Sequence, residues 1–512
     1  MKKLLRILSI LLVMSILAVS LLTGCTKKNE QKGQSNVTKS PDASAQPTEN
    51  LPQVPKEHVQ LEWYFFQPDP GPGIRDVEQA VGEYLKDKIN VSIKIHTLGW
   101  DEFFTRKDTM IAANEPFDLI FQPSWLGFNS TVQKNGLLDI TELVPKYMPK
   151  TWELINSKDS YKKLLVGATV EGKLYAVPTI KEVGAQLAIT FNKNLLDKYN
   201  LKIDNIKDSQ DLTPLLQVIK DNEPDVFPTI GIPFEHLYSY YPVLADDVIT
   251  LRAKRGTTKV EVLYDLPEYK EYALLMREWN IKGFIPSDRP IMQQNALNEF
   301  RNNGKVFLAE ANNIPGDEEK RSNDKVRWVN LALQPPTLRN KDLGGSQNAV
   351  SATSKNPDRA LMFLEYVNTD AYVNNLLAFG IEGKHYKKIN TNTIEPIKDS
   401  GYSHGWQWAY GNQFLNYLKV GEDDKKWELY EQFNSKCIPD PNLGFYFNTE
   451  KWEHVINAQK TLINEYYLGY GIVKKSVDED LAELKKRLKD IGFYDFRDAV
   501  QQAYDEWLKN NK

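Results

Sequence analysis

The chain has 512 residues with 64 basic and 68 acidic side chains and a net charge of −4. It therefore lacks the basic surplus of nucleic-acid-binding proteins, and no nucleic-acid partner is expected. Its only cysteines, Cys25 and Cys437, cannot support a disulfide framework, and its six scattered histidines form no HExxH motif or Cys/His ligand set. We expect no metal site and no cofactor. Neither a GxSxG elbow nor a GxxxxGK[ST] loop occurs.

The N-terminus has the pattern of an export signal. A positive segment ending at Arg6 precedes an apolar stretch from Ile7 to Leu22, shorter than the roughly 20 residues that span a bilayer. The stretch runs into LTGC, which resembles a lipobox, and Cys25 is then the residue that takes up a diacylglyceryl group. We expect a lipoprotein signal peptide over residues 1–24. Residues 25–55 have no aromatic side chain and many polar ones, so they predict a disordered tether after the lipidated cysteine.

The globular part begins with alternating strand and helix patterns. Val59–Phe66 is rich in aromatic and branched residues, and apolar positions between Val77 and Ile89 share one helix face. Val91–Leu98 alternates apolar and polar residues, a second helix is predicted through residues 103–111, and Phe117–Phe121 is a compact apolar run. The order β-α-β-α-β predicts a mostly parallel sheet with right-handed crossovers, an α/β fold.

Two loops are expected to face a ligand, because open α/β sheets bind ligands beyond the carboxyl ends of their strands. These loops are residues 67–73 and residues 122–128. The first contains Gly71-Pro72-Gly73 but lacks the third glycine of a dinucleotide loop, so a plain turn that starts a helix is favoured over a nucleotide site.

A second α/β region is predicted further along the chain. Gly172–Ile180, Gln186–Asn192 and Lys305–Asn313 have strand patterns, separated by helices and by loops rich in Pro and Tyr. One later helix is expected to begin at Pro357, and another at the capping box that opens with Ser476.

Aromatic and polar residues gather at predicted loop positions. A sugar offers apolar C–H faces and a rim of hydroxyls, so its site needs flat aromatic walls and aimed acids and amides. A single tryptophan in such a sequence more often belongs to a core, but Trp406 and Trp408 would face the same way at strand spacing. The candidates are Trp125, Trp406 and Trp408, beside Gln122, Ser124, Glu182 and Asn312.

The mature chain resembles the extracytoplasmic solute-binding proteins of ABC importers, in the sugar-binding group that includes maltodextrin-binding proteins. The resemblance is carried by LEWYFFQPDPGPGIRDVEQAVGEYLKDKINVSIKI, EPFDLIFQPSW, GKLYAVPTIKE ahead of ITFNKNLLDKYNL, and SKNPDRALMFLEYVN. The C-terminal third is similar to the LipO-like lipoproteins of Gram-positive bacteria.

The resemblance implies a two-lobed periplasmic-binding-protein-like fold (type II), with the ligand cleft between hinge-linked lobes. One lobe would comprise residues 56–182 and about 350–392, and the other residues 183–349 and about 393–512. The hinge strands would lie near Glu182–Ala188 and Gly344–Ser351, with a third crossing near Ile389–Ile394.

The resemblance also implies the positions of ligand contacts. It places Gln67 and Asp69 in the loop after the first strand, residues 122–125 in the loop after the third, and an acidic contact at Glu182. Relatives often have an aromatic residue where this chain has Asn312, so stacking is expected from Trp406 and Trp408 instead.

The implied function is capture of an oligosaccharide by hinge closure and its delivery to ABC permease subunits, without catalysis. Such a protein would be a monomer outside the cytoplasm, lipid-anchored to a Gram-positive membrane. Two alternatives remain open: a receptor for a peptide or other polar solute, and a surface-anchored carbohydrate-active enzyme, since 68 acidic residues offer many carboxylate pairs.

Overall fold

The computed structural model describes residues 54–66, 70–238, 243–245, 248–402 and 406–511. Cys25, Gln67 and Asp69 lie outside the described residues. The expectations of lipidation and of ligand contacts at these three positions therefore stay predictions.

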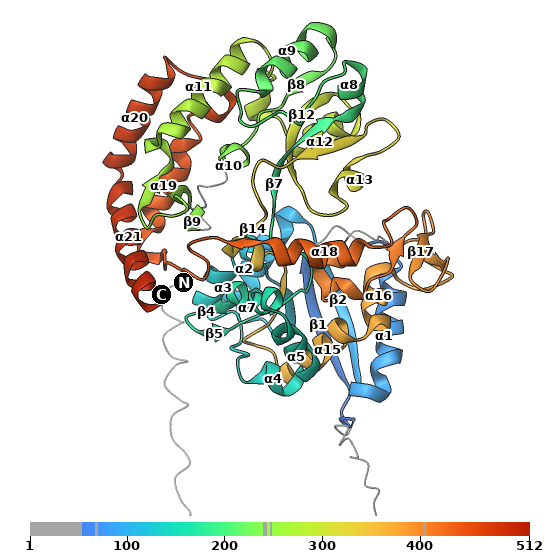
Figure 1. The fold of residues 1–512 in the computed structure, drawn as a ribbon. Helices are drawn as coiled ribbons and strands as arrows, with labels where there is room; N and C mark the ends of the chain where they lie inside the picture. Colours follow the sequence, from blue (N-terminus) through green and yellow to red (C-terminus); the bar gives the residue numbers. More distant parts are fainter. Residues whose placement is uncertain (1–53, 67–69, 239–242, 246–247, 403–405, 512) are drawn as a thin grey trace, which may run out of the picture. The chain divides into compact units, whose positions relative to one another are not determined.

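The first sheet contains the predicted β-α-β-α-β unit, drawn in blue in Figure 1. Strand β1 pairs in parallel with β2 and with β3, with Val59 opposite Val91 and Trp63 opposite Leu119. An antiparallel strand, β15, joins β3 to the edge strand. The strand order is β2 (Val91–Leu98), β1 (Val59–Phe66), β3 (Leu119–Phe121), β15 (Gln347–Val350) and β6 (Val177–Pro178).

Helices cover this sheet because alternate strand residues are large and apolar. Leu61, Trp63 and Phe65 on β1 are fully buried. Val77 and Val81 on one face of α1 belong to the same core, as the helical spacing predicts. The helices of this region include α1 (Ile74–Ile89), α2 (Trp100–Ala112), α15 (Pro357–Thr369) and α16 (Ala371–Phe379). We call the part of the chain packed around this core the first lobe.

The second sheet has four strands in the order β13, β7, β12, β8. Strand β12 is antiparallel to β7 and parallel to β8, and β13 is antiparallel to β7. Two of the strands were predicted, since β7 (Leu187–Asn192) and β12 (Val306–Asn312) fall within the expected segments. The others are β8 (Phe227–Thr229) and β13 (Trp328–Leu331), and α8 (Lys193–Lys198), α9 (Leu212–Asn222), α11 (Pro267–Ile281) and α12 (Gln294–Asn302) belong to this region.

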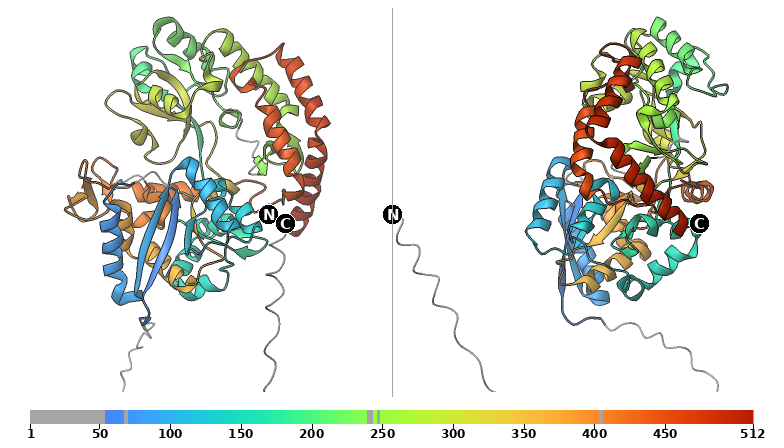
Figure 2. Two further views of the ribbon diagram at one scale, coloured as in Figure 1. Left: turned by 180° about the vertical axis from the view of Figure 1, so that it is seen from behind. Right: turned by 90° about the vertical axis from the view of Figure 1, so that its left-hand side faces the viewer.

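The C-terminal helices pack into the core of this second sheet. Leu484 and Tyr504 are buried in one cluster with Phe191 of β7 and Phe307 of β12. Figure 2 shows these helices, in red, beside α11. They are α19 (Glu453–Ile463), α20 (Val477–Asp490) and α21 (Phe493–Asn510). We call this part, with its sheet, the second lobe.

Helix α20 has Ser476 as its N-cap residue, where the capping box was predicted. The Ser476 hydroxyl oxygen accepts from the Glu479 backbone N–H at 3.2 Å and bonds the Glu479 carboxylate at 2.8 Å. The helix start predicted at Pro357 is also present, although the Asn356 side chain makes no capping hydrogen bond.

Three chain segments cross between the lobes and bond to one another. Ala185 and Thr337 exchange two backbone hydrogen bonds, of 2.8 and 3.0 Å. Strand β14 (Thr337–Leu338) pairs in parallel with β19 (Ile438–Pro439). The three crossings therefore lie side by side. Because they connect the lobes, their conformation sets the relative orientation of the lobes.

Only the first crossing lies where the sequence placed it, near Glu182–Ala188. The second was expected near Gly344–Ser351, but β15 lies inside the first sheet and the crossing comes earlier, at Thr337. The third was expected near Ile389–Ile394. Those residues belong to the hairpin of β16 (Tyr386–Lys388) and β17 (Thr393–Pro396), and the crossing comes later, at β19.

The first lobe also extends past residue 392, where a boundary was expected. Tyr402, Ala409 and Tyr410 belong to its core, and the Tyr402 hydroxyl donates to the Leu377 carbonyl at 2.7 Å. Short aromatic segments that pack on an existing core carry no periodic signal, so this extension was not predicted.

Candidate functional site

A crevice of about 260 Å³ lies where the crossings meet both sheets. Three residues predicted to contact a ligand line it: Trp125 after β3, Glu182 on the first crossing, and Asn312 at the end of β12. Four charged residues complete its polar lining: Lys181, Arg339, Lys341 and Asp342. The crevice thus combines a first-lobe residue, a second-lobe residue and two crossings.

Trp125 is held in a fixed orientation although 39% of it is exposed. Its indole Nε1–H donates to the Gly345 carbonyl at 2.8 Å. Its ring meets Phe66 edge-on at a centroid distance of 5.4 Å, and Phe121 at 6.1 Å. Both phenylalanines end parallel strands of the first sheet, so the sheet itself positions this aromatic surface.

Trp406 and Trp408 lie against the same two phenylalanines. Trp406 meets Phe66 at 5.6 Å and Trp408 meets Phe121 at 5.9 Å, and the two indoles are 5.2 Å apart at 35°. The two tryptophans were expected at strand spacing. They lie instead at the helical turn α17 (Gln407–Tyr410). The structure therefore brings the three predicted tryptophans to one end of the sheet, although only Trp125 lines the crevice.

The charged residues of the crevice form ion pairs. Lys181 is bonded to Glu182, with side chains 13% and 18% exposed. Arg339 makes a two-pronged contact with Asp342, in which the Nη2···Oδ1 distance is 2.6 Å, and these side chains are 17% and 14% exposed. Burial disfavours the charged guanidinium, but the carboxylates of Asp342, Asp440 and Glu235 together outweigh burial, so the pKa of Arg339 lies above its ordinary value.

A buried carboxyl lies behind these pairs. Asp440, on the third crossing, is ion-paired with Arg255, and its side chain is 2% exposed. Burial raises the pKa of Asp440 to about 6, against the opposing charges of Arg255 and Arg339.

Gln122 and Ser124 do not line the crevice. The Gln122 side chain is fully buried and donates to the Leu126 carbonyl at 2.9 Å, so it supports its own loop. The Ser124 hydroxyl donates to the Lys341 carbonyl at 3.2 Å. These two predicted contacts therefore shape the wall that carries Trp125, and Gln122 has no exposed surface for a ligand.

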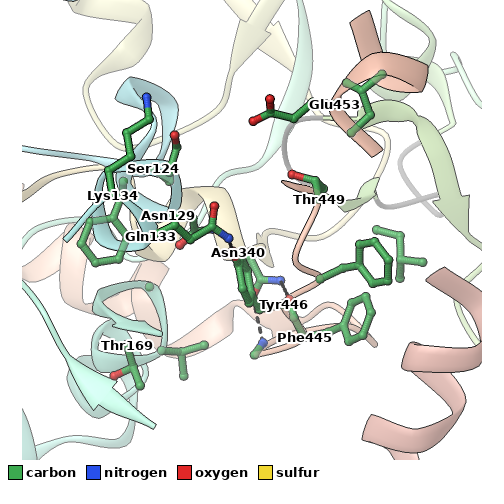
Figure 3. Close-up of a pocket in the computed structure, with 18 of the residues that line it drawn as sticks. Ser124, Asn129, Gln133, Lys134, Thr169, Asn340, Phe445, Tyr446, Thr449 and Glu453 are labelled. Atoms are coloured by element: carbon green, nitrogen blue, oxygen red, sulfur yellow. Dashed lines mark hydrogen bonds between the residues drawn. The ribbon is translucent and has the colours of Figure 1, made fainter. Parts of the chain in front are cut away.

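A second pocket, of about 630 Å³, lies on the other side of Ser124. Figure 3 shows Ser124 and Lys134 on one side of it and Thr449 and Glu453 on the other. The Gln133 amide bonds the Tyr446 hydroxyl across it. Its lining also includes Asn129, Thr169, Asn340, Asn457 and Lys460.

A tight seam separates the pocket from the crevice. The Ser124 backbone N–H donates to the Gly344 carbonyl at 2.8 Å. A Cβ on Gly167 would lie 2.2 Å from the Gly344 nitrogen, so a side chain there has no room. Consecutive residues face opposite sides, because Ser124 lines the pocket and Trp125 the crevice.

Sequence reasoning missed Arg339, Lys341 and Asp342. A signal was available, since the charged run RNKD stands between Pro335-Pro336 and Gly344-Gly345. Charges confined between turn residues and two strands indicate an ordered polar loop.

Two further properties concern chemistry and membrane insertion. Among the described residues, no cluster of three or more His, Cys, Asp or Glu side chains is placed to hold a metal ion. Every helix in the described part of the chain is too short or too polar to cross a membrane.

Two known proteins of similar sequence come from Streptococcus pneumoniae. The chain is 27% identical over 441 residues to a carbohydrate ABC transporter substrate-binding protein, covering 84% of this chain and 87% of that one. It is 22% identical over 429 residues to the fructooligosaccharide ABC transporter substrate-binding protein FusA, covering 74% and 77%.

Solved structures of similar fold include relatives with bound sugars. The N-glycan transport solute-binding protein NgtS of S. pneumoniae matches with a TM-score of 0.77 and 24% identity, covering 88% of this chain and 100% of that one. FusA in complex with kestose matches with a TM-score of 0.60 and 17% identity, over the same shares. These matches confirm the predicted two-lobed periplasmic-binding-protein-like fold.

Family models account for most of the globular chain. A domain of unknown function (DUF3502) matches residues 441–509. The model described as bacterial extracellular solute-binding protein matches residues 71–374, which is more than half of the chain. This chain therefore belongs to the bacterial extracellular solute-binding proteins, which bind a solute and are not enzymes.

Proposed function

We propose that this protein captures an oligosaccharide outside the cell and delivers it to the permease of an ABC importer. The observation that carries the proposal is the crevice, where the fixed Trp125 indole faces the same space as two ion pairs. A sugar ring matches this arrangement, because its C–H face packs on an indole while its hydroxyls bond to charged groups. Sugars named with the relatives FusA and NgtS support this class of ligand.

Capture would use the three crossings as a hinge. Trp125 belongs to the first lobe and Asn312 to the second, so a ligand that bonds to both is held best when both walls touch it. Binding would then favour a closed arrangement of the lobes, which the permease recognises. The ligand leaves this protein chemically unchanged.

The test is calorimetry of the globular chain with neutral oligosaccharides, such as kestose, nystose and a mannose–N-acetylglucosamine oligosaccharide. Tryptophan fluorescence would report the contact with Trp125, and mass spectrometry of the recovered sugar should find it unmodified. Binding of peptides with no oligosaccharide bound would overturn the proposal in favour of a peptide receptor. Release of shortened products would favour an enzyme.

We also propose that the protein is held at the outer face of the cell membrane by a lipid on Cys25. Support comes from the LTGC motif and the polar segment after it. In a Gram-positive host, an alkyne-tagged fatty acid should label the wild-type protein and not a Cys25→Ala variant. Equal labelling of the two would reject the anchor.

A further inference from the structure

Two of the three cations that line the crevice form an ion pair with a carboxylate that also lines it. Lys181 is paired with Glu182, and Arg339 with Asp342. Both pairs are largely shielded from water, with all four side chains less than one-fifth exposed. Screening by solvent is weak at such positions, so the partners hold each other strongly.

The third cation, Lys341, acts on carboxylates that lie behind the crevice, and its charge acts to lower their pKa. These carboxylates belong to Glu235 and Asp440. Asp440 is also ion-paired with Arg255. Two of the cations in the lining, and Arg255 behind it, are therefore already ion-paired before a ligand arrives.

We infer that the crevice selects uncharged glycans and disfavours glycans that carry a carboxylate, such as uronic or sialic acids. This inference rests on the proposed function. An incoming carboxylate that bonds to Lys181 or Arg339 must take that cation from its partner, which leaves Glu182 or Asp342 uncompensated in a poorly hydrated place. It would also lie beside that partner's negative charge.

A sugar hydroxyl meets no such conflict. It donates one hydrogen bond to a carboxylate and accepts another from a cation, so it bonds to both members of a pair without separating them. Adjacent hydroxyls of a pyranose or furanose ring can do this at both pairs. The same residues that attract neutral sugars thus exclude acidic ones.

The first experiment compares glycans of equal length with and without a carboxylate. Calorimetry would use a neutral hexose trisaccharide against a uronic acid trisaccharide, and a neutral N-glycan oligosaccharide against its sialylated form. We expect every neutral glycan that binds to do so at least about tenfold more tightly than its acidic counterpart. Equal or tighter binding of the acidic glycans would overturn the inference and leave the proposed function standing. Failure of all glycans to bind would overturn both.

A variant tests whether the pairs cause the selection. Glu182→Gln keeps the side-chain shape and releases Lys181 from its ion pair, and the residue's 18% exposure makes it tolerant of the change. We expect the affinity for acidic glycans to rise about tenfold or more and the affinity for neutral glycans to fall. The ratio of neutral to acidic affinity should therefore become smaller or reverse.

The matched control is Asp197→Asn, which removes an exposed carboxylate from the Lys193–Asp197 pair on α8, away from the crevice. It should leave both affinities unchanged, and circular dichroism should show that both variants are folded. A neutral-to-acidic ratio that is the same in Glu182→Gln and in the wild type would overturn the inference.

Discussion

The crevice and the second pocket lie on two sides of one seam and differ in how their side chains are held. The pocket is larger, about 630 Å³ against about 260 Å³. Yet Gln133, Lys134 and Glu453 in the pocket are exposed, whereas the ion-paired side chains of the crevice are largely shielded. Trp125 is fixed by its N–H bond to Gly345.

The difference shows that size alone does not identify a binding site. Groups already held in place lose little conformational freedom when a ligand arrives, so more of the contact energy appears as affinity. Exposed side chains that must first be ordered contribute less. The smaller, preorganised crevice is therefore the better candidate.

The largest expected effect comes from breaking the seam. Gly167→Ala places a methyl group 2.2 Å from the Gly344 nitrogen and 2.4 Å from the Leu343 carbonyl carbon, so the backbone must move. We expect the free energy of unfolding, measured with urea, to fall by about 3 kcal/mol.

The control is Gly99→Ala, where a Cβ meets nothing within 4 Å. It should cost about 1 kcal/mol or less. Equal losses in the two variants would show that the seam is not tightly packed.

The buried carboxyl behind the crevice predicts that the stability of the protein depends on pH. Burial raises the pKa of Asp440 from 3.8 to about 6, so the folded state holds this proton more tightly than the unfolded state does. The contribution to stability is present below about pH 4 and is lost as pH rises through about 6, by up to about 3 kcal/mol.

Asp440→Asn cannot titrate, so its unfolding free energy should change less over this range. Urea titrations of both proteins between about pH 4 and pH 7 measure the difference. Parallel pH profiles would contradict the prediction.

Removing the aromatic wall should weaken binding without unfolding the protein. We expect Trp125→Ala to lower oligosaccharide affinity about 30-fold, or about 2 kcal/mol, because it deletes the exposed stacking surface. Trp125→Phe keeps an aromatic face but loses the bond to Gly345, and should cost less. Calorimetry measures both, and an unchanged affinity in Trp125→Ala would move the site elsewhere.

The smallest effect is expected in the second pocket. Gln133→Ala removes the bond to Tyr446 but no group of the crevice. Affinity for neutral oligosaccharides should therefore change by less than about twofold. A loss as large as that of Trp125→Ala would show that the ligand extends into the pocket.

Elements with a periodic pattern of apolar residues could be predicted from the sequence. Elements fixed by contacts between distant parts of the chain could not. The alternation of Leu61, Trp63 and Phe65 was enough to place β1, and β1 with its neighbours placed Trp125 at a strand end. Glu182 was a candidate as a polar residue at a predicted loop position, and the family resemblance also implied it as an acidic contact. The Arg339–Asp342 pair was not foreseen, because the crossings that bring its loop beside Lys181 depend on long-range strand pairing.

Two local predictions failed for a similar reason. The segment with Trp406 and Trp408 was read as extended, but packing on Phe66 and Phe121 decides its helical turn. Gln122 was read as a ligand contact, yet a polar side chain at a strand end can bond to its own loop, as it does with the Leu126 carbonyl.

The C-terminal helices share one hydrophobic core with the second sheet, so they do not form a separate domain. Residues 441–509 match a family model of their own, but their side chains Phe445, Leu484 and Tyr504 fill the same interior as Phe191 and Phe307. A chain truncated before residue 441 would leave that interior open to water, and the excised helices would have nothing to cover. The segment that the family model covers is therefore smaller than the hydrophobic core to which it contributes.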